Sequence, residues 1–200
     1  MAQLTIPLDS ARFAKGMNRK DYMAQMGDTR ARTEENYSKA SLTDEERKFF
    51  SGISQVKYVL MLGENWCGDV HRNSPMIARI AEAMPNAELR MFLRDQNVDL
   101  TDCFLNNGYK SIPIVVFFDK DWNEIGRWIE RAGAATQRAF SIRSKTLDVA
   151  AADQQDAAMA EFRKQVQGSY DTAADKSLWR ETAKEVRTVL ETRLGLAAAK

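Results

Sequence analysis

The strongest constraint on the fold is the order of three compact apolar runs of strand length, at residues 56–62, 89–93 and 114–118. Between the first two runs, apolar residues recur at spacings of three and four over residues 68–84, which is typical of one face of a helix. Residues 99–107 are expected to form a helix between the second and third runs. The sequence therefore predicts the order strand, helix, strand, helix, strand.

A fourth strand is expected after the third apolar run. Residues 119–123 have the polar composition of a hairpin turn, residues 124–129 follow it as a strand, and a helix is expected from about Ala134. A hairpin joins antiparallel strands, whereas the earlier strand-helix-strand unit favours parallel ones. We therefore predict an α/β fold with a mixed four-stranded central sheet flanked by helices.

Segments without strand signals flank this core. Residues 19–51 are polar and helix-prone, and within them Thr43-Asp44-Glu45-Glu46 has the form of a capping box, so two or three short helices are expected. The Ala-rich, charged segments 151–167 and 175–194 are expected to form two long helices. An apolar stripe on the last helix, packed on the domain or on a partner, would comprise Leu178, Val186, Val189, Leu190 and Leu194.

The chain length suits one domain with appendages, since 200 residues fall near the usual size of a single domain. We expect an N-terminal helical extension (1–51), a central domain (52–142) and a C-terminal helical extension (143–200). The 29 basic and 28 acidic residues leave one formal positive charge, which argues against a nucleic-acid or membrane partner. No apolar run approaches the length of a spanning helix and residues 1–16 lack a signal-peptide core, so a cytoplasmic location is expected.

Cysteine and histidine usage limits the chemistry. Cys67 and Cys103 are the two cysteines, and a reducing compartment keeps such residues as thiols unless they are catalytic. His71 is the single histidine, whereas a zinc site draws three or four ligands from Cys, His and carboxylates at characteristic spacings. Those spacings are absent, so we expect no metal and no cofactor.

Cys67 stands at the expected start of a helix, where backbone amides and the helix dipole stabilise a thiolate and lower its pKa. Asp69 either opposes this as a like charge or caps the helix, and both alternatives stay open. His71 lies one turn on and could stabilise the thiolate as an imidazolium, the alternative being an exposed, solvated histidine. Arg72 could pair with Asp69 on the surface.

Three local marks, together with the order of elements, resemble the thioredoxin superfamily. Trp66-Cys67-Gly68 is similar to the Trp-Cys-Gly that opens the thioredoxin active site, and Pro75 falls where that family has a kink proline in the following helix. The loop at residues 108–113, which ends in Pro113, is similar to the loop that carries the family's cis-proline. The resemblance covers about residues 52–142 and implies the thioredoxin fold.

The resemblance also implies where a substrate would bind. A cis-proline at Pro113 would hold Ile112 extended, with its backbone facing the thiol and able to pair with an incoming strand. Trp66, next to the thiol, is expected to form part of the contact surface. The form Trp-Cys-Gly-Asp, together with residues 92–95 and 126–128, resembles a bacterial group of thioredoxin-like proteins that also lack the second cysteine.

Two residues depart from the thioredoxin pattern. Val70 stands where a second cysteine would release a mixed disulfide, and Met61 stands where thioredoxins carry a buried acid. A redox-active Cys67 would therefore be released by an outside thiol. Cys103 is the internal alternative, but its helix should lie on the opposite face of the sheet, and a disulfide needs α-carbons within about 7 Å. A small buried core thiol is expected there.

Two hypotheses follow for function. The first is a single-cysteine thiol protein in cell redox homeostasis, with Cys67 as nucleophile and thiols or disulfides of proteins or small molecules as partners. The second is a non-catalytic binding module with a degenerate redox site, whose helical extensions contact a partner or form a homodimer. An iron-sulfur carrier like the monothiol glutaredoxins is disfavoured, because Asp69-Val70 departs from their Cys-Gly-Phe-Ser.

Overall fold

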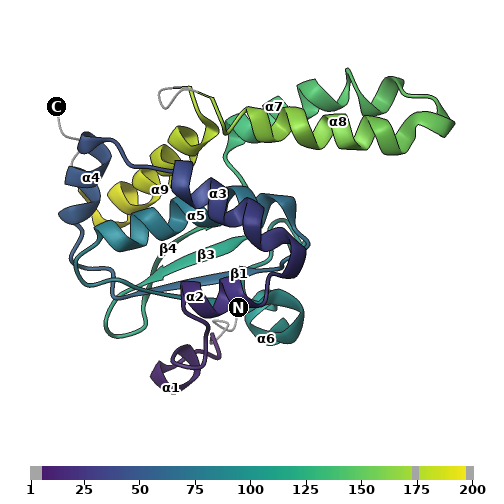
Figure 1. The fold of residues 1–200 in the computed structure, drawn as a ribbon. Coiled ribbons are helices and arrows are strands. Elements are labelled where there is room, and N and C mark those ends of the chain that lie inside the picture. Colours follow the sequence, from purple (N-terminus) through teal and green to yellow (C-terminus); the bar gives the residue numbers. More distant parts are fainter. Residues whose placement is uncertain (1–5, 173–175, 197–200) are drawn as a thin grey trace.

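The centre of the computed structural model, which describes residues 6–172 and 176–196, is one four-stranded sheet (Figure 1). Its strand order is β2-β1-β3-β4, with β1 parallel to β2 and antiparallel to β3, and β4 antiparallel to β3. The strands are β1 (Tyr58–Gly63), β2 (Glu88–Leu93), β3 (Ile114–Phe118) and β4 (Glu124–Ile129). The predicted α/β class, a mixed four-stranded sheet flanked by helices, is confirmed.

The two central strands explain why the apolar runs are continuous. Every residue of β3 is buried, and so is every residue of β1 after Tyr58. A strand covered on both faces needs apolar side chains at every position, whereas the edge strands β2 and β4 have partly exposed positions. The unbroken runs in the sequence therefore mark the middle of the sheet.

Long helices cover the sheet. α5 (Gly68–Ala83) packs against α3 (Arg30–Lys39) and α9 (Leu178–Leu194), and α9 also packs on β4 (Figure 1). Pro75 lies inside α5, and the expected helix after Cys67 is confirmed. The remaining α-helices are α1 (Ser10–Phe13), α2 (Arg19–Ala24), α4 (Asp44–Ser51), α6 (Val98–Asp102), α7 (Gly133–Arg143) and α8 (Gln155–Gly168). Short 3₁₀ turns are η1 (Gly27–Thr29), η2 (Arg94–Gln96), η3 (Leu147–Val149) and η4 (Ala152–Gln154).

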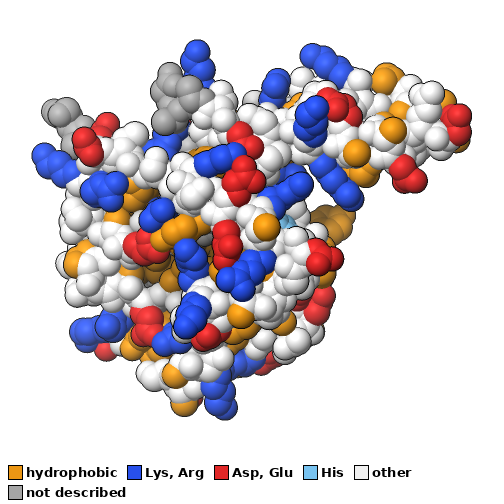
Figure 2. Space-filling view, in the orientation of Figure 1, with side chains coloured by type: hydrophobic (Ala, Val, Ile, Leu, Met, Phe, Trp, Pro, Cys, Tyr) orange, Lys and Arg blue, Asp and Glu red, His pale blue; other side chains and the backbone are white. Residues whose placement is uncertain are grey.

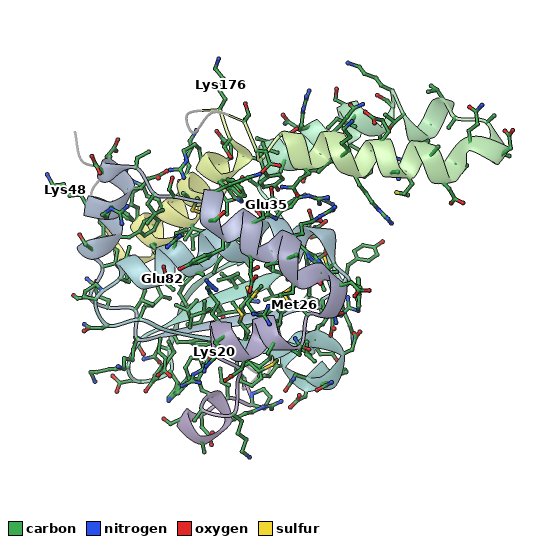
Figure 3. All side chains as sticks on the ribbon, in the orientation of Figure 1. Lys20, Met26, Glu35, Lys48, Glu82 and Lys176 are labelled. Atoms are coloured by element: carbon green, nitrogen blue, oxygen red, sulfur yellow. The ribbon has the colours of Figure 1, made fainter. Side chains whose placement is uncertain are left out.

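The helices expected in residues 19–51 are present. Figure 3 shows Lys20 on α2 and Glu35 on α3, with Met26 at the turn between these two helices. The capping box of α4 forms in both directions: Glu46 N–H donates to Thr43 Oγ1 at 3.2 Å and Thr43 N–H donates to Glu46 Oε2 at 2.8 Å. The side chains of Thr43 and Glu46 thus pair with free backbone amides at the N-terminus of α4, as the sequence predicted.

The two long C-terminal helices have different surroundings. α7 and α8 pack against each other and project from the body, and residues 133–168 are called the arm below (Figure 1). α9 returns to the body, where Leu178, Val186 and Leu190 of the predicted stripe are buried. The stripe therefore packs on the domain. The predicted three-part division of the chain stays a prediction.

The helix expected over residues 99–107 is shorter than predicted, because α6 ends at Asp102. Asn107 and Gly108 have positive φ values of 50° and 83°, which a right-handed helix excludes. Asn106 and Tyr109 exchange backbone hydrogen bonds of 2.8 and 2.9 Å across this turn. Gly108 therefore closes a tight turn that leads to β3.

No helix within residues 6–172 and 176–196 combines the length and the apolar character that crossing a membrane requires.

Close packing of α9 on the sheet depends on Gly126 of β4. A Cβ at this position would lie 2.7 Å from Cγ1 of Val189 in α9. Gly126→Ala should lower the free energy of unfolding by about 1–3 kcal/mol, because overpacking must push helix and strand apart. Urea unfolding measures the change. Gly168→Ala is the matched control, since nothing lies within 4 Å of its Cβ, and equal stability of the two variants would contradict the packing.

Candidate functional site

Cys67 occupies the N-cap of α5, directly after the short loop that leaves β1. Its side chain is half-buried, and the thiol donates a hydrogen bond to the carbonyl oxygen of Ile112, with Sγ and O separated by 3.6 Å. The Ile112–Pro113 peptide bond is cis. The structure thus brings Cys67, Ile112 and Pro113 together, at the point where β1 ends and β3 begins.

The ionisation of Cys67 differs from the sequence expectation. Burial raises the pKa of the thiol above its ordinary value, and this effect outweighs the hydrogen bonds from the backbone amides of Val70 and Asp69. The Asp69 carboxylate raises the pKa further, while Arg72 lowers it. The backbone amides at the helix start lower the pKa of the thiol, as expected, but burial, which the sequence did not reveal, raises it by more. At neutral pH the protonated thiol dominates.

Asp69 does not cap α5 with its side chain, so that alternative is wrong. Its carboxylate is largely buried and pairs with Arg131 at 2.9 Å and with Arg72 at 3.5 Å. Burial raises the pKa of Asp69, and the two arginines oppose that shift. The expected pair with Arg72 exists, but it lies in the interior and not on the surface, because both side chains are mostly covered.

His71 is buried, which excludes the exposed histidine considered from the sequence. Its Nδ1 lies 3.1 Å from Oγ1 of Thr33 in α3, and burial lowers the pKa of the imidazole. Its backbone carbonyl accepts a 2.9 Å hydrogen bond from Asn36. The structure therefore favours a neutral imidazole tied to α3, which weakens the predicted imidazolium beside the thiol.

Val70 and Met61 are fully buried. The Val70 methyl groups lie 3.1 and 3.2 Å from where a Cβ on Gly63 would be, so this side chain packs tightly on the end of β1. Position 70, where a second cysteine would stand, is therefore occupied by an apolar side chain that packs in the core next to β1.

Trp66 forms an exposed rim beside the thiol, with 60% of its surface accessible. The guanidinium of Arg94 lies 4.9 Å from the centre of its indole ring and also donates to the carbonyl of Lys110 at 3.2 Å. Tyr109, next in this loop, is 74% exposed. Arg94 thus connects the Trp66 rim to the loop that precedes Ile112. The roles of Trp66, Ile112 and Pro113 in substrate binding stay predictions.

Two buried polar residues near the site were not singled out from the sequence. Glu64 accepts a 2.8 Å hydrogen bond from the backbone amide of Asp95 and so ties the loop after β1 to the end of β2. The Tyr22 hydroxyl, from α2, is buried without a partner among the described residues; burial raises its pKa, and Glu64 and Cys67 add to that rise. No motif in the sequence around Glu64 or Tyr22 indicated that these residues lie near Cys67, because tertiary packing brings them there.

Cys103 follows α6 and is half-buried, so the expectation of a buried core thiol was wrong. The helix ends one residue earlier and leaves the side chain at its edge, where Sγ donates to the Asp99 carbonyl at 3.3 Å. Both cysteines are free thiols. Within the described ranges, no group of three Cys, His, Asp or Glu side chains is arranged to hold a metal ion.

Known proteins are similar to this chain in family and fold. A model of the thioredoxin family matches residues 16–146. A crystal structure of an HIV epitope scaffold has a TM-score of 0.62 and 16% identity, covering 92% of this chain and 99% of that chain. A protein of unknown function from Pseudomonas aeruginosa has a TM-score of 0.58 and 19% identity, covering 80% and 98%. At these identities the two structures show a common fold alone, and no curated protein matches the chain.

The pH dependence of Cys67 alkylation tests the electrostatics of the site. Its midpoint should lie above about 8.5, the ordinary thiol value, because burial stabilises the protonated form. Asp69→Asn removes a like charge, so it should move the midpoint to lower pH and raise the rate at neutral pH several-fold. Iodoacetamide labelling in a Cys103→Ser background provides the measurement. Asp102→Asn is the control, and an unchanged or higher midpoint in Asp69→Asn would contradict the assignment.

Proposed function

The chain belongs to the thioredoxin family, and from that premise we propose that it is a thiol protein that acts through one cysteine, Cys67. It captures a protein or small-molecule disulfide as a mixed disulfide and depends on an outside thiol for release. The observation that carries this proposal is the placement of the Cys67 thiol at 3.6 Å from the Ile112 carbonyl, beside a cis peptide bond and an apolar Val70.

The chemistry has two steps. The Cys67 thiolate attacks one sulfur of a disulfide, a new sulfur–sulfur bond forms, and the other sulfur leaves as a thiolate that takes up the proton lost by Cys67. An outside thiolate then attacks the partner's sulfur in the adduct, and Cys67 leaves and is reprotonated. At the end, one sulfur of the partner disulfide is a thiol and the other is bonded to the outside thiol. Cys67 is again a free thiol.

The raised pKa of Cys67 predicts the kinetics of both steps. Capture is slow at neutral pH, because little thiolate is present. Release is also slow, because a thiol of high pKa is a poor leaving group. The protein would therefore hold a mixed disulfide for long periods, whereas a dithiol enzyme turns over rapidly.

The surroundings of the thiol support a peptide as one kind of partner. The backbone of Ile112 adjoins the thiol, and extended peptides commonly bind by pairing with the backbone of an exposed strand edge or loop. Exposed Trp66 and Tyr109 flank this point and offer apolar contact area.

Adding the missing cysteine tests the proposal. With a protein that carries an accessible disulfide, the natural chain should accumulate the Cys67 adduct, whereas Val70→Cys should shorten the adduct's lifetime by at least about tenfold, because an intramolecular thiol needs no encounter. Non-reducing gels and intact-mass spectrometry follow the adduct. Cys103→Ser should behave like the natural chain. Absence of any Cys67 adduct above pH 8.5 would refute the proposed reaction.

A second candidate function is a non-catalytic binding module, and the largely protonated thiol favours it. In that case the surface beside Ile112 holds a partner without covalent chemistry. Cys67→Ser separates the two candidates: a binding module keeps its partners and cellular role with serine, whereas the thiol protein loses both. Homodimer formation through the helical extensions stays a prediction, which sedimentation of the purified chain checks.

A further inference from the structure

A cavity of about 410 Å³ lies at the start of α5, and it is lined by both sequence neighbours of Cys67 but not by Cys67 itself. Trp66 and Gly68, the two neighbours of Cys67 in sequence, line it on one side. Arg32 of α3, Arg72 of α5 and Arg163 of α8 complete it, so the cavity lies where the arm meets the body. Figure 2 shows this region as a hollow beneath the arm, with blue Lys and Arg side chains around it.

The lining is strongly cationic. The lining contains three arginines but one carboxylate, that of Asp28, and burial lowers the pKa of His71, which favours its neutral form. The cavity also lies at the N-terminus of the 16-residue helix α5, where the helix dipole adds positive potential. An anion is the ligand that this environment favours.

Arg72 supplies an independent reason to expect a ligand. Its side chain is buried, with 9% of the residue exposed, yet its Nε has no hydrogen-bond partner among the described residues. Within residues 6–172 and 176–196 its one ion pair, with Asp69, is 3.5 Å long, and Asp69 is held more closely by Arg131 at 2.9 Å. Arg72 lines the cavity with a largely buried guanidinium whose Nη1 is 3.5 Å from the Asp69 carboxylate, and such a group gains from an anion that completes its contacts.

Gly68 leaves room for the Arg72 guanidinium against the backbone at the start of α5. A Cβ at position 68 would lie 3.0 Å from Nη1 of Arg72. The glycine therefore permits the arginine to pack over the helix N-terminus, next to the residue that carries the thiol.

We propose that this cavity binds the carboxylates of a low-molecular-weight thiol, or of its disulfide, and presents the ligand's sulfur to Cys67. The inference deepens the proposed function and rests on it. A volume of about 410 Å³ falls within the range of about 300–1,000 Å³ usual for small-molecule pockets. Neither Ile112 nor Pro113 lines the cavity, so a small thiol and a captured peptide would have separate places beside one sulfur.

The reaction at this site balances without a further reagent. The Cys67 thiolate attacks the disulfide of two small thiols, one small thiol stays bound to Cys67 as a mixed disulfide, and the other leaves and takes the proton. To release a captured partner, the thiolate of a small thiol seated in the cavity would attack the partner's sulfur in the adduct; the bond to Cys67 breaks, and Cys67 leaves as a thiolate and takes up the proton. The cavity would thus hold the outside thiol that is needed for release because position 70 is valine and not cysteine.

Two disulfides of different charge test the proposal on the full chain in a Cys103→Ser background. The rate of Cys67 adduct formation is measured by intact-mass spectrometry with glutathione disulfide, which is anionic, and with hydroxyethyl disulfide, which is neutral. The double variant Arg32→Ala/Arg163→Ala should slow the reaction of glutathione disulfide by about tenfold, through loss of charge-assisted contacts, and leave hydroxyethyl disulfide unchanged. Arg72 is left intact because its burial gives it a structural role as well.

A matched control removes two arginines of the same helix and the same arm that do not line the cavity, Arg30 and Arg143. Arg30→Ala/Arg143→Ala makes the same change in net charge and should leave both rates unchanged. Equal slowing in the two double variants would overturn the cavity as the binding site and assign the effect to overall charge.

Binding without reaction separates this inference from the proposed function. S-methylglutathione cannot form a disulfide, and calorimetry should detect salt-sensitive binding to the natural chain that Arg32→Ala/Arg163→Ala abolishes. Reaction of Cys67 with the neutral disulfide but no binding of S-methylglutathione would overturn the cavity and leave the thiol function standing. Binding without any adduct would support the cavity and refute the thiol function.

Discussion

The site depends on the contact between the Cys67 thiol and the Ile112 carbonyl, 3.6 Å apart. β1 delivers the chain into α5, β3 begins just after the cis peptide bond, and the sheet order places these two strands side by side. The same contact covers the thiol, and burial is the largest influence on its pKa. One arrangement therefore places the sulfur beside the backbone at which a partner is proposed to bind and raises the pKa of the thiol.

Behind the thiol lies a buried polar layer that connects the C-terminal helix to the site. The Trp179 indole of α9 donates to the Arg72 carbonyl at 2.6 Å, and Thr182 donates to Asn73 at 2.9 Å. Buried polar groups are costly unless they are paired, so α9 is joined to the helix that carries Cys67. Arg72, in the same layer, also lines the cavity beneath the arm, and its buried Nε has no hydrogen-bond partner among the described residues.

Local signals in the sequence predicted the strands and most helices, because β1 and β3 are buried throughout and Thr43 with Glu46 closes α4 by itself. The properties of the site residues were harder to predict. Burial lowers the pKa of His71, whose ring contacts Thr33 of α3, and no spacing near residue 71 reveals that contact. The position of Cys67 at a helix start was readable, whereas its raised pKa results from burial, which only the tertiary structure determines.

In the proposed function, one thiol captures a partner and needs another molecule for release. The lifetime of a purified Cys67 mixed disulfide, after all small thiols are removed, tests this most directly. The adduct should persist and should decay only when a low-molecular-weight thiol is added. Spontaneous release of the partner, with a disulfide forming between Cys67 and Cys103, would contradict it.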